Sequence, residues 1–142
     1  MNYIDTSALL KWYLPEAGSD AFTAWISAQH QADTSRLVSV EMHVVLARKQ
    51  RIGELSNAQA TRALAAFLAD VDDGLLRVQS IDAAHWEEAE RLITVAALPA
   101  LRTLDALHLA VASVAQVDEF ATADRTLAAA ARALGMRTPV LH

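Results

Sequence analysis

Apolar residues along this chain form short runs that alternate with longer stretches of helical spacing. The short runs, which are typical of buried strands, are residues 2–4, 36–38, 75–78, 119–121 and 137–140. With the helical stretches between them, the predicted order is β-α-α-β-α-α-β-α-α-β-α-β. Strands that alternate with helices form parallel sheets covered on both sides. The pattern therefore predicts a single α/β domain over residues 1–142 with a central, mostly parallel sheet.

Three segments carry apolar side chains at helical spacing. These stripes are Ala60, Leu64, Phe67, Leu68 and Val71; Trp86, Ala89, Ile93 and Ala96; and Leu127, Ala131 and Leu134. Gly135 follows the last stripe, and glycine is the residue that most often ends a helix. Residues 107–115 are apolar on nearly every side, which predicts a helix buried on most faces. We expect Trp86, in the second stripe, to lie in the core.

Composition excludes several classes of protein. The longest stretches without a charged residue span 12 positions, 21–32 and 106–117, whereas a membrane-spanning helix needs about 20. The absence of cysteine excludes disulfides and thiolate metal sites and fits a reducing compartment. The first residues lack the basic and apolar regions of a signal peptide. These observations predict a cytoplasmic protein with no membrane association, and the net charge of −5 argues against simple electrostatic binding of nucleic acid.

The familiar phosphate-binding and nucleophile motifs are missing. The chain has no G-x-x-x-x-G-K-[ST], no G-x-G-x-x-G, no G-x-S-x-G and no H-x-x-x-H. Its isolated glycines therefore do not build a phosphate cradle, and no α/β-hydrolase elbow is present. Candidate chemistry must come from other residue types.

Four acidic residues fall at the ends of predicted elements. Asp5 and Asp124 directly follow predicted strands, where ligands bind in an open parallel sheet. Glu41 lies two residues after Ser39, a predicted N-cap, and Asp105 lies near the start of an apolar helix. Each acid taken alone is explained as a helix cap or dipole partner. Taken together, with no basic residue placed to neutralise all four, they predict a cation site.

The donor type selects the cation. Carboxylates without cysteine or paired histidine form a hard, all-oxygen site that suits Mg²⁺ or Mn²⁺. Two such ions, about 3.5–4 Å apart, stabilise both the attacking and the leaving oxygen in phosphodiester hydrolysis. A bound metal would also let a negatively charged chain bind phosphate.

Several neighbours of these acids have two interpretations. Ser7 and Thr122 lie two residues from an acid and either orient a ligand or bond the local backbone. Arg102, just before Asp105, is expected to contact substrate phosphate. His108 lies on nearly the same helix face as Asp105, but we expect a buried histidine bonded to a carbonyl or an acid rather than a metal ligand.

At these residues the sequence closely resembles PIN-domain proteins, in particular the VapC-type toxin ribonucleases. The matching segments, in the order of the family, are IDTSALLK (residues 4–11), YLPE (13–16), SVE (39–41), LDALHLA (104–110) and TADRTL (122–127), followed by Ala131 and Gly135. The resemblance implies a PIN-like three-layer α/β/α sandwich with a sheet of four or five strands. Its metal-site and catalytic acids would be Asp5, Glu41, Asp105 and Asp124, of which Asp5 and Asp105 are the strongest candidates for direct ligands.

The resemblance also implies an activity and partners. These are a Mg²⁺- or Mn²⁺-dependent endoribonuclease acting on structured RNA such as tRNA or rRNA, a homodimer, and inhibition by a cognate antitoxin. The antitoxin is expected to place a cation, an arginine, into the acid cluster, and Trp12 and Trp25 are candidates to line its groove. Two alternatives stay open: a catalytically silent PIN-like module that binds RNA or protein, and a metal-dependent phosphatase or DNA nuclease that uses the same acids.

Overall fold

The chain folds around a small central sheet with a helix pair between successive strands. The computed structural model describes residues 1–95 and 97–141. The elements are β1 (Asn2–Ile4), α1 (Thr6–Tyr13), α2 (Ser19–Ser27), β2 (Ala32–Ser35), α3 (Arg36–Arg51), α4 (Asn57–Asp72), β3 (Leu76–Gln79), α5 (Ala83–Val95), α6 (Thr103–Val114), β4 (Glu119–Ala121) and α7 (Arg125–Ala133). The predicted element order is confirmed up to the last helix.

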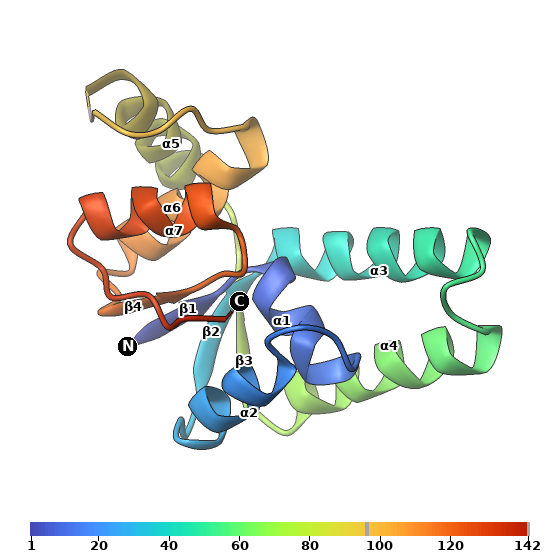
Figure 1. Ribbon diagram of the computed structural model, residues 1–142. Helices are drawn as coiled ribbons and strands as arrows, with labels where there is room; N and C mark the ends of the chain where they lie inside the picture. Colours follow the sequence, from blue (N-terminus) through green and yellow to red (C-terminus); the bar gives the residue numbers. More distant parts are fainter. Residues whose placement is uncertain (96, 142) are drawn as a thin grey trace.

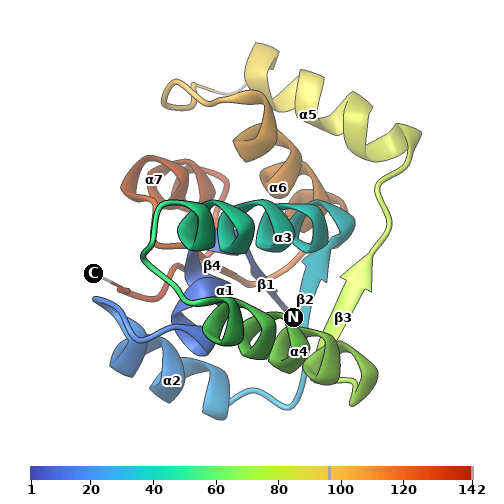
Figure 2. The same cartoon turned by 90° about the vertical axis from the view of Figure 1, so that its right-hand side faces the viewer.

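The four strands are all parallel and lie in the order β3-β2-β1-β4. Helices cover both faces, with α5, α6 and α7 on one side and α1 to α4 on the other (Figure 1). Helices α3 and α4 form a long hairpin that extends from the sheet (Figure 1 and Figure 2). This is the predicted three-layer α/β/α sandwich.

Each face of the sheet has its own hydrophobic core. Adjacent residues of β1 point to opposite faces, as in any strand: Tyr3 packs under α6 and α7, and Ile4 packs under α1 and α3. Residues 106–112 of α6 are all buried, which confirms the predicted enclosed helix up to residue 112, whereas Val114 near its end is 47% exposed. The middle of the sheet is therefore buried from solvent, and polar groups there need hydrogen-bond partners within the protein.

The predicted strand at residues 36–38 is wrong. These residues begin α3, and the neighbouring strand β2 has the sequence ADTS, buried at every position. A search for apolar runs misses such a strand because three of its four buried residues are polar. Thr34 Oγ1 donates to the Ile4 carbonyl at 3.0 Å, and Asp33 Oδ1 accepts from Arg77 Nε at 2.6 Å.

Two further expectations differ from the structure. Residues 137–140 form no strand; an isolated bridge joins Glu119 to Arg137, so the sheet has four strands. The stripe predicted in α5 is correct at Ala89, which is buried, but wrong at Trp86 and Ile93, which are 51% and 57% exposed; Leu92, outside the stripe, is buried instead. Apolar residues therefore lie on two faces of this helix, and Ala89 and Leu92 are on the face that packs against α6. Ala96 lies outside the described residues.

No helix in the part of the chain that the structure describes has the length and apolar character needed to cross a bilayer.

Candidate metal and nuclease site

Two of the predicted acids follow neighbouring strands at the carboxyl edge of the sheet. Asp5 follows β1 and Asp124 follows β4, and these strands pair in parallel with Ile4 opposite Ala121. Each acid caps the helix that follows: Asp5 Oδ1 accepts from the Ala8 amide at 2.9 Å, and Asp124 Oδ1 accepts from the Leu127 amide at 3.0 Å. The predicted location after strand ends is confirmed, and the capping interpretation holds at the same time.

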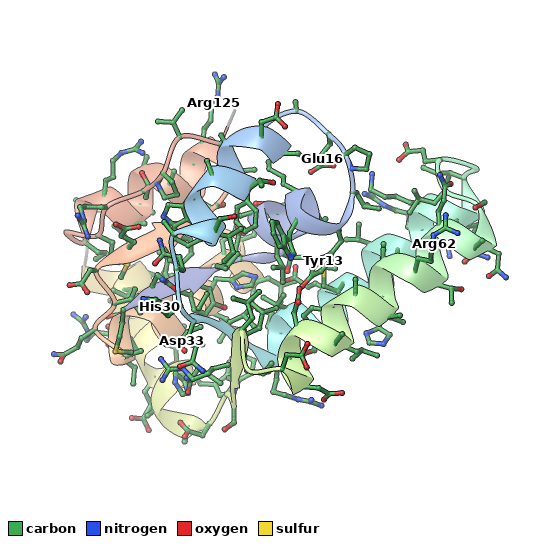
Figure 3. The ribbon with its side chains drawn as sticks, turned by 90° about the horizontal axis from the view of Figure 1, so that it is seen from below. Tyr13, Glu16, His30, Asp33, Arg62 and Arg125 are labelled. Carbon is green, nitrogen blue, oxygen red and sulfur yellow. The ribbon has the colours of Figure 1, made fainter. Side chains whose placement is uncertain are left out.

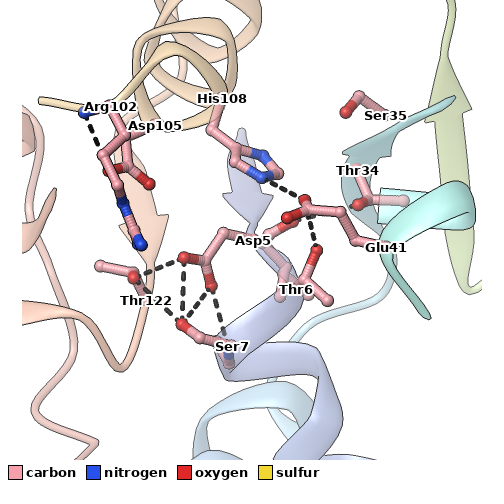
Figure 4. A network of polar contacts seen from close by, with 12 residues as sticks. Asp5, Thr6, Ser7, Thr34, Ser35, Glu41, Arg102, Asp105, His108 and Thr122 are labelled. Atoms are coloured by element: carbon pink, nitrogen blue, oxygen red, sulfur yellow. Dashed lines mark hydrogen bonds and ion pairs between the residues drawn. The ribbon is translucent and has the colours of Figure 1, made fainter. Parts of the chain in front are cut away.

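Asp5 is the most deeply buried acid of the site, with 4% of its surface exposed. Thr122 Oγ1 donates to its Oδ2 at 2.6 Å, and the Ser7 hydroxyl, 2.8 Å from Oδ1, donates to the same carboxylate (Figure 4). Burial raises the pKa of the Asp5 carboxyl, although the charge of His108 and these hydrogen bonds oppose the shift. A cation beside this carboxylate would offset the cost of burying its charge.

Ser7 and Thr122 also bond the backbone, as the local interpretation of these residues expects, whereas their role in orienting a ligand stays a prediction. Ser7 Oγ accepts from the Ala123 amide at 2.9 Å, and Thr122 Oγ1 accepts from the Asp124 amide at 3.0 Å. The two hydroxyls are 3.2 Å apart. They join the loop after β4 to the start of α1 and fix the orientation of the Asp5 carboxylate.

Glu41 reaches the site from α3, but not from its first turn. The helix begins at Arg36 with Ser35 at the N-cap position, so Ser39 is no cap and Glu41 is the sixth helical residue. The prediction shifted because the strand before α3 was misplaced. Glu41 Oε1 accepts from Thr6 Oγ1 at 2.8 Å and lies 2.7 Å from His108 Nε2 (Figure 4).

The charge on Glu41 is stabilised by its neighbours. Burial alone would raise the pKa of Glu41, but the hydrogen bond and charge of His108, the hydroxyl of Thr6 and the charge of Arg102 together lower it. Glu41 is therefore held as a carboxylate. Its stabilising contribution is present above the ordinary pKa and is lost as the pH falls through the lowered value.

Asp105 lies in the first turn of α6, as predicted, beside Arg102. Arg102 Nε is 3.3 Å from Asp105 Oδ2, and the Arg102 side chain is 83% exposed. Such an exposed pair is weak, so the guanidinium stays available to another anion. Glu41, Arg102 and Asp105, with Thr103 and Leu104, line a groove of about 360 Å³.

Figure 4 shows the labelled acids Asp5, Glu41 and Asp105, which come from the start of α1, from α3 and from α6; of these, Glu41 and Asp105 line the groove described above, whereas Asp5 is buried beside it. Asp124 belongs to the neighbouring loop: its Oδ1 accepts from the Leu127 amide, and its own amide donates to Thr122 Oγ1. Among the described residues, no three acidic or histidine side chains are gathered closely enough to enclose a metal ion. The donors themselves are hard carboxylate oxygens that fit Mg²⁺ or Mn²⁺, so metal binding stays a prediction that rests on donor chemistry.

Sequence reasoning missed three residues of this site. Thr6 holds Glu41, and the Tyr3 hydroxyl lies 2.8 Å from His108 Nδ1 and 2.9 Å from Ser35 Oγ. Thr6 could have been found in the sequence because it directly follows Asp5. For Tyr3 and Ser35 the signal was weaker: a tyrosine in a buried strand needs a partner for its hydroxyl. His108 is buried and bonded to an acid, as expected.

A second groove, of about 630 Å³, lies between the end of α1 and the α3–α4 hairpin. Tyr13, Glu16 and Arg62 are on its walls and are labelled in Figure 3. Trp12 and Trp25, the predicted wall residues, instead fix helices: their Nε1 atoms donate to Asp70 at 3.0 Å and to Glu119 at 2.7 Å. Neither indole lines this groove.

Comparison with known proteins shows which family this chain is similar to. A family model described as "PIN domain" matches residues 3–133. Two curated relatives from Mycobacterium tuberculosis are similar over most of the chain. Ribonuclease VapC46 is 34% identical and covers 94% of this chain and 92% of its own length. Ribonuclease VapC35 is 35% identical, with coverages of 96% and 93%.

Solved structures share the fold at lower identity. M. tuberculosis VapC20, described as a toxin that cleaves the sarcin–ricin loop, has a TM-score of 0.69 and 20% identity over 92% of this chain and 95% of its own. FitAcB from Neisseria gonorrhoeae has a TM-score of 0.69 and 14% identity, with coverages of 97% and 96%. These two likenesses show the α/β/α fold.

Proposed function

Because the chain belongs to the PIN-domain family, we propose that it is a VapC-type toxin endoribonuclease that hydrolyses RNA phosphodiester bonds in the cytoplasm. The supporting observation is that three of the four predicted acids come from different elements to one site: Glu41 and Asp105 line one groove, and Thr6, the residue after Asp5, bonds Glu41 (Figure 4). The names of the ribonuclease relatives at 34% and 35% identity support the same activity.

The proposed cofactor is Mg²⁺ or Mn²⁺. Asp5, Glu41 and Asp105 would hold it, with Asp124 as a fourth acid at the same sheet edge. When bound, such an ion supplies an activated water and stabilises charge on the leaving oxygen.

The chain's own residues position the substrate and the acids. The exposed Arg102 guanidinium, 3.3 Å from Asp105, would exchange this weak ion pair for a bidentate contact to an RNA phosphate. Ser7 and Thr122 hold the Asp5 carboxylate in place. Phosphate contacts carry no sequence information, so recognition of RNA must come from base or 2′-hydroxyl contacts elsewhere in the groove.

Purified protein incubated with tRNA and rRNA tests the proposal. We expect cleavage in Mn²⁺ or Mg²⁺ that stops in EDTA, with sites clustered in structured regions. Cleavage that continues in EDTA would contradict the metal dependence. No cleavage of either RNA, with no Mn²⁺ bound, would favour a silent PIN-like binding module. Cleavage of DNA but not RNA would favour the nuclease alternative.

The groove between α1 and the α3–α4 hairpin is our candidate site for a cognate antitoxin. Its walls combine apolar Tyr13, Leu14 and Leu55 with charges of both signs, including Lys49 and Glu54. An amphipathic segment would bury its apolar face there. It would also extend an arginine to the acid cluster, where negative charge favours a cation.

Ala66→Arg tests this groove. Ala66 is an exposed residue on the groove wall, so the longer side chain should fill the groove without disturbing the core. The affinity for the proposed cognate antitoxin, measured by calorimetry, should weaken at least tenfold. Ala65→Arg, a neighbouring exposed position outside the groove, should leave binding unchanged; equal effects of the two variants would contradict the proposal.

We also propose that two copies of the chain associate. The support is an apolar surface formed by Val40, Val44 and Leu68, which are 59%, 60% and 47% exposed. Exposed apolar clusters of this kind are typical of interfaces. Light scattering should give the mass of a dimer, and Val44→Asp should give that of a monomer. Ile52→Asp, at an exposed position beyond the end of α3, should leave the dimer intact. A monomeric wild type would rule the dimer out.

A further inference from the structure

We propose that His108 is a positioning residue that holds Glu41 in its metal-ready orientation. The inference rests on the proposed metal-dependent site. It assigns His108 no contact with metal or substrate; its role is to fix one oxygen of Glu41 so that the other is presented to the groove.

His108 connects the site to the interior of the sheet. Its side chain is 4% exposed, and it lies between Glu41 Oε1 at 2.7 Å and the Tyr3 hydroxyl at 2.8 Å. The chain of contacts continues from Tyr3 to Ser35, 2.9 Å away at the N-cap position of α3. It joins β1, α6 and the start of the helix that carries Glu41. Its members lie at positions 3, 35, 41 and 108, so only the folded sheet brings them together.

The chemistry of these groups fixes the hydrogen bond at the Glu41 end of the chain. An ionised carboxylate only accepts hydrogen bonds, so His108 Nε2 must carry a hydrogen and donate to Glu41. The other ring nitrogen, Nδ1, is paired with the Tyr3 hydroxyl, and a hydroxyl can either donate to it or accept from it. The Tyr3 hydroxyl is paired in turn with the Ser35 hydroxyl. Both ring nitrogens of His108 therefore have partners, and these two contacts hold the imidazole in one orientation.

The consequence is an asymmetric Glu41 carboxylate. Both hydrogen bonds that the described residues give Glu41, from His108 and from Thr6, end on Oε1 (Figure 4). Oε2 is left for the groove that Glu41 lines with Asp105. Partners that orient a ligand in this way commonly change metal affinity or activity 10–100-fold when removed.

Two substitutions separate positioning from packing. His108→Leu fills the space but removes the donor, and we expect the dissociation constant for Mn²⁺, measured by calorimetry, to rise about 10–100-fold. The kcat for RNA cleavage should fall by a similar factor while KM changes less than about twofold. His108→Gln keeps an N–H donor and should recover most of both losses. His30→Gln, at an exposed histidine, is the matched control and should match wild type.

A spectroscopic measurement on the metal-free wild-type protein keeps the test independent of folding defects. Imidazole ¹⁵N NMR should show His108 protonated at Nε2, and Tyr3→Phe, which keeps the ring stacked on Phe120, should shift the Nδ1 resonance. A His108 protonated only at Nδ1, or a folded His108→Leu variant with wild-type Mn²⁺ affinity and kcat, would overturn the inference. A wild type that neither binds Mn²⁺ nor cleaves RNA would instead overturn the proposed function.

Discussion

Asp5→Asn should abolish RNA cleavage and leave the fold intact. The substitution removes a charge and almost no volume, and asparagine is as good an N-cap as aspartate, so α1 should still begin at Thr6. A bound metal ion stabilises the transition state by several kcal/mol, and each 1.36 kcal/mol changes the rate tenfold. We therefore expect the cleavage rate to fall about a thousandfold or more. Single-turnover cleavage of RNA in Mn²⁺ measures it.

The same variant should be at least as stable as wild type when metal is absent. Burial raises the pKa of Asp5 above its ordinary value of 3.8. The folded state therefore binds a proton more tightly than the unfolded state, and wild-type stability falls as the pH rises from about 3.8 through the raised folded value. Asparagine does not ionise and should remove this contribution. Urea denaturation in EDTA at several pH values measures the difference.

Asp20→Asn is the control for this prediction. Asp20 is an exposed acid in the first turn of α2, so the substitution makes the same chemical change outside the site and should preserve cleavage. An Asp5→Asn protein that retains wild-type cleavage would contradict the assignment of Asp5. A large drop in its stability would mean that the fold, rather than the chemistry, explains the loss.

Arg77→Met should give the largest loss of stability among the charge substitutions considered. Asp33 is 1% exposed in the middle of β2, and its Oδ1 accepts from Arg77 Nε at 2.6 Å (Asp33 is labelled in Figure 3). Its other oxygen, Oδ2, has no hydrogen-bond partner among the described residues. Removing the cation leaves an uncompensated buried charge, which typically costs 3–5 kcal/mol; because Arg77 is half exposed, we expect about 2–3 kcal/mol.

A second substitution should recover that loss. In Asp33→Val/Arg77→Met both members of the pair are apolar, and such replacements are often neutral or stabilising. Urea denaturation should place the double variant within about 1 kcal/mol of wild type. Arg125→Met, at an exposed arginine that starts α7, should change stability by less than about 0.5 kcal/mol. If Arg77→Met behaves like Arg125→Met, the ion pair contributes nothing to the fold.

The elements that could be predicted from the sequence are those with a strong local pattern. The apolar run before Asp5, the enclosed helix after Asp105 and the stripe that ends at Gly135 all appear in the structure. Placement of Asp5 and Asp124 at one edge followed because parallel strands end at the same side of a sheet. These inferences needed no knowledge of which residues meet across the core.

Features that depend on tertiary partners could not be predicted. Strand β2 has no apolar run, and its buried Asp33 and Thr34 find partners only in the folded chain, where Asp33 Oδ1 accepts from Arg77 and Thr34 donates to the Ile4 carbonyl. Missing that strand displaced the start of α3 and put Glu41 in the wrong turn. The contacts of His108 with Glu41 and Tyr3 depend on the strand order β3-β2-β1-β4, which local periodicity does not determine.

Crystals soaked in Mn²⁺ test most directly whether these carboxylates hold a divalent ion. Anomalous diffraction locates manganese without reference to activity. We predict a manganese peak within coordination distance of Asp5 and Asp105 in the wild type and no peak there in Asp5→Asn. A saturating soak that leaves no manganese beside Asp5 and Asp105, in a protein that cleaves RNA in EDTA, would contradict the account.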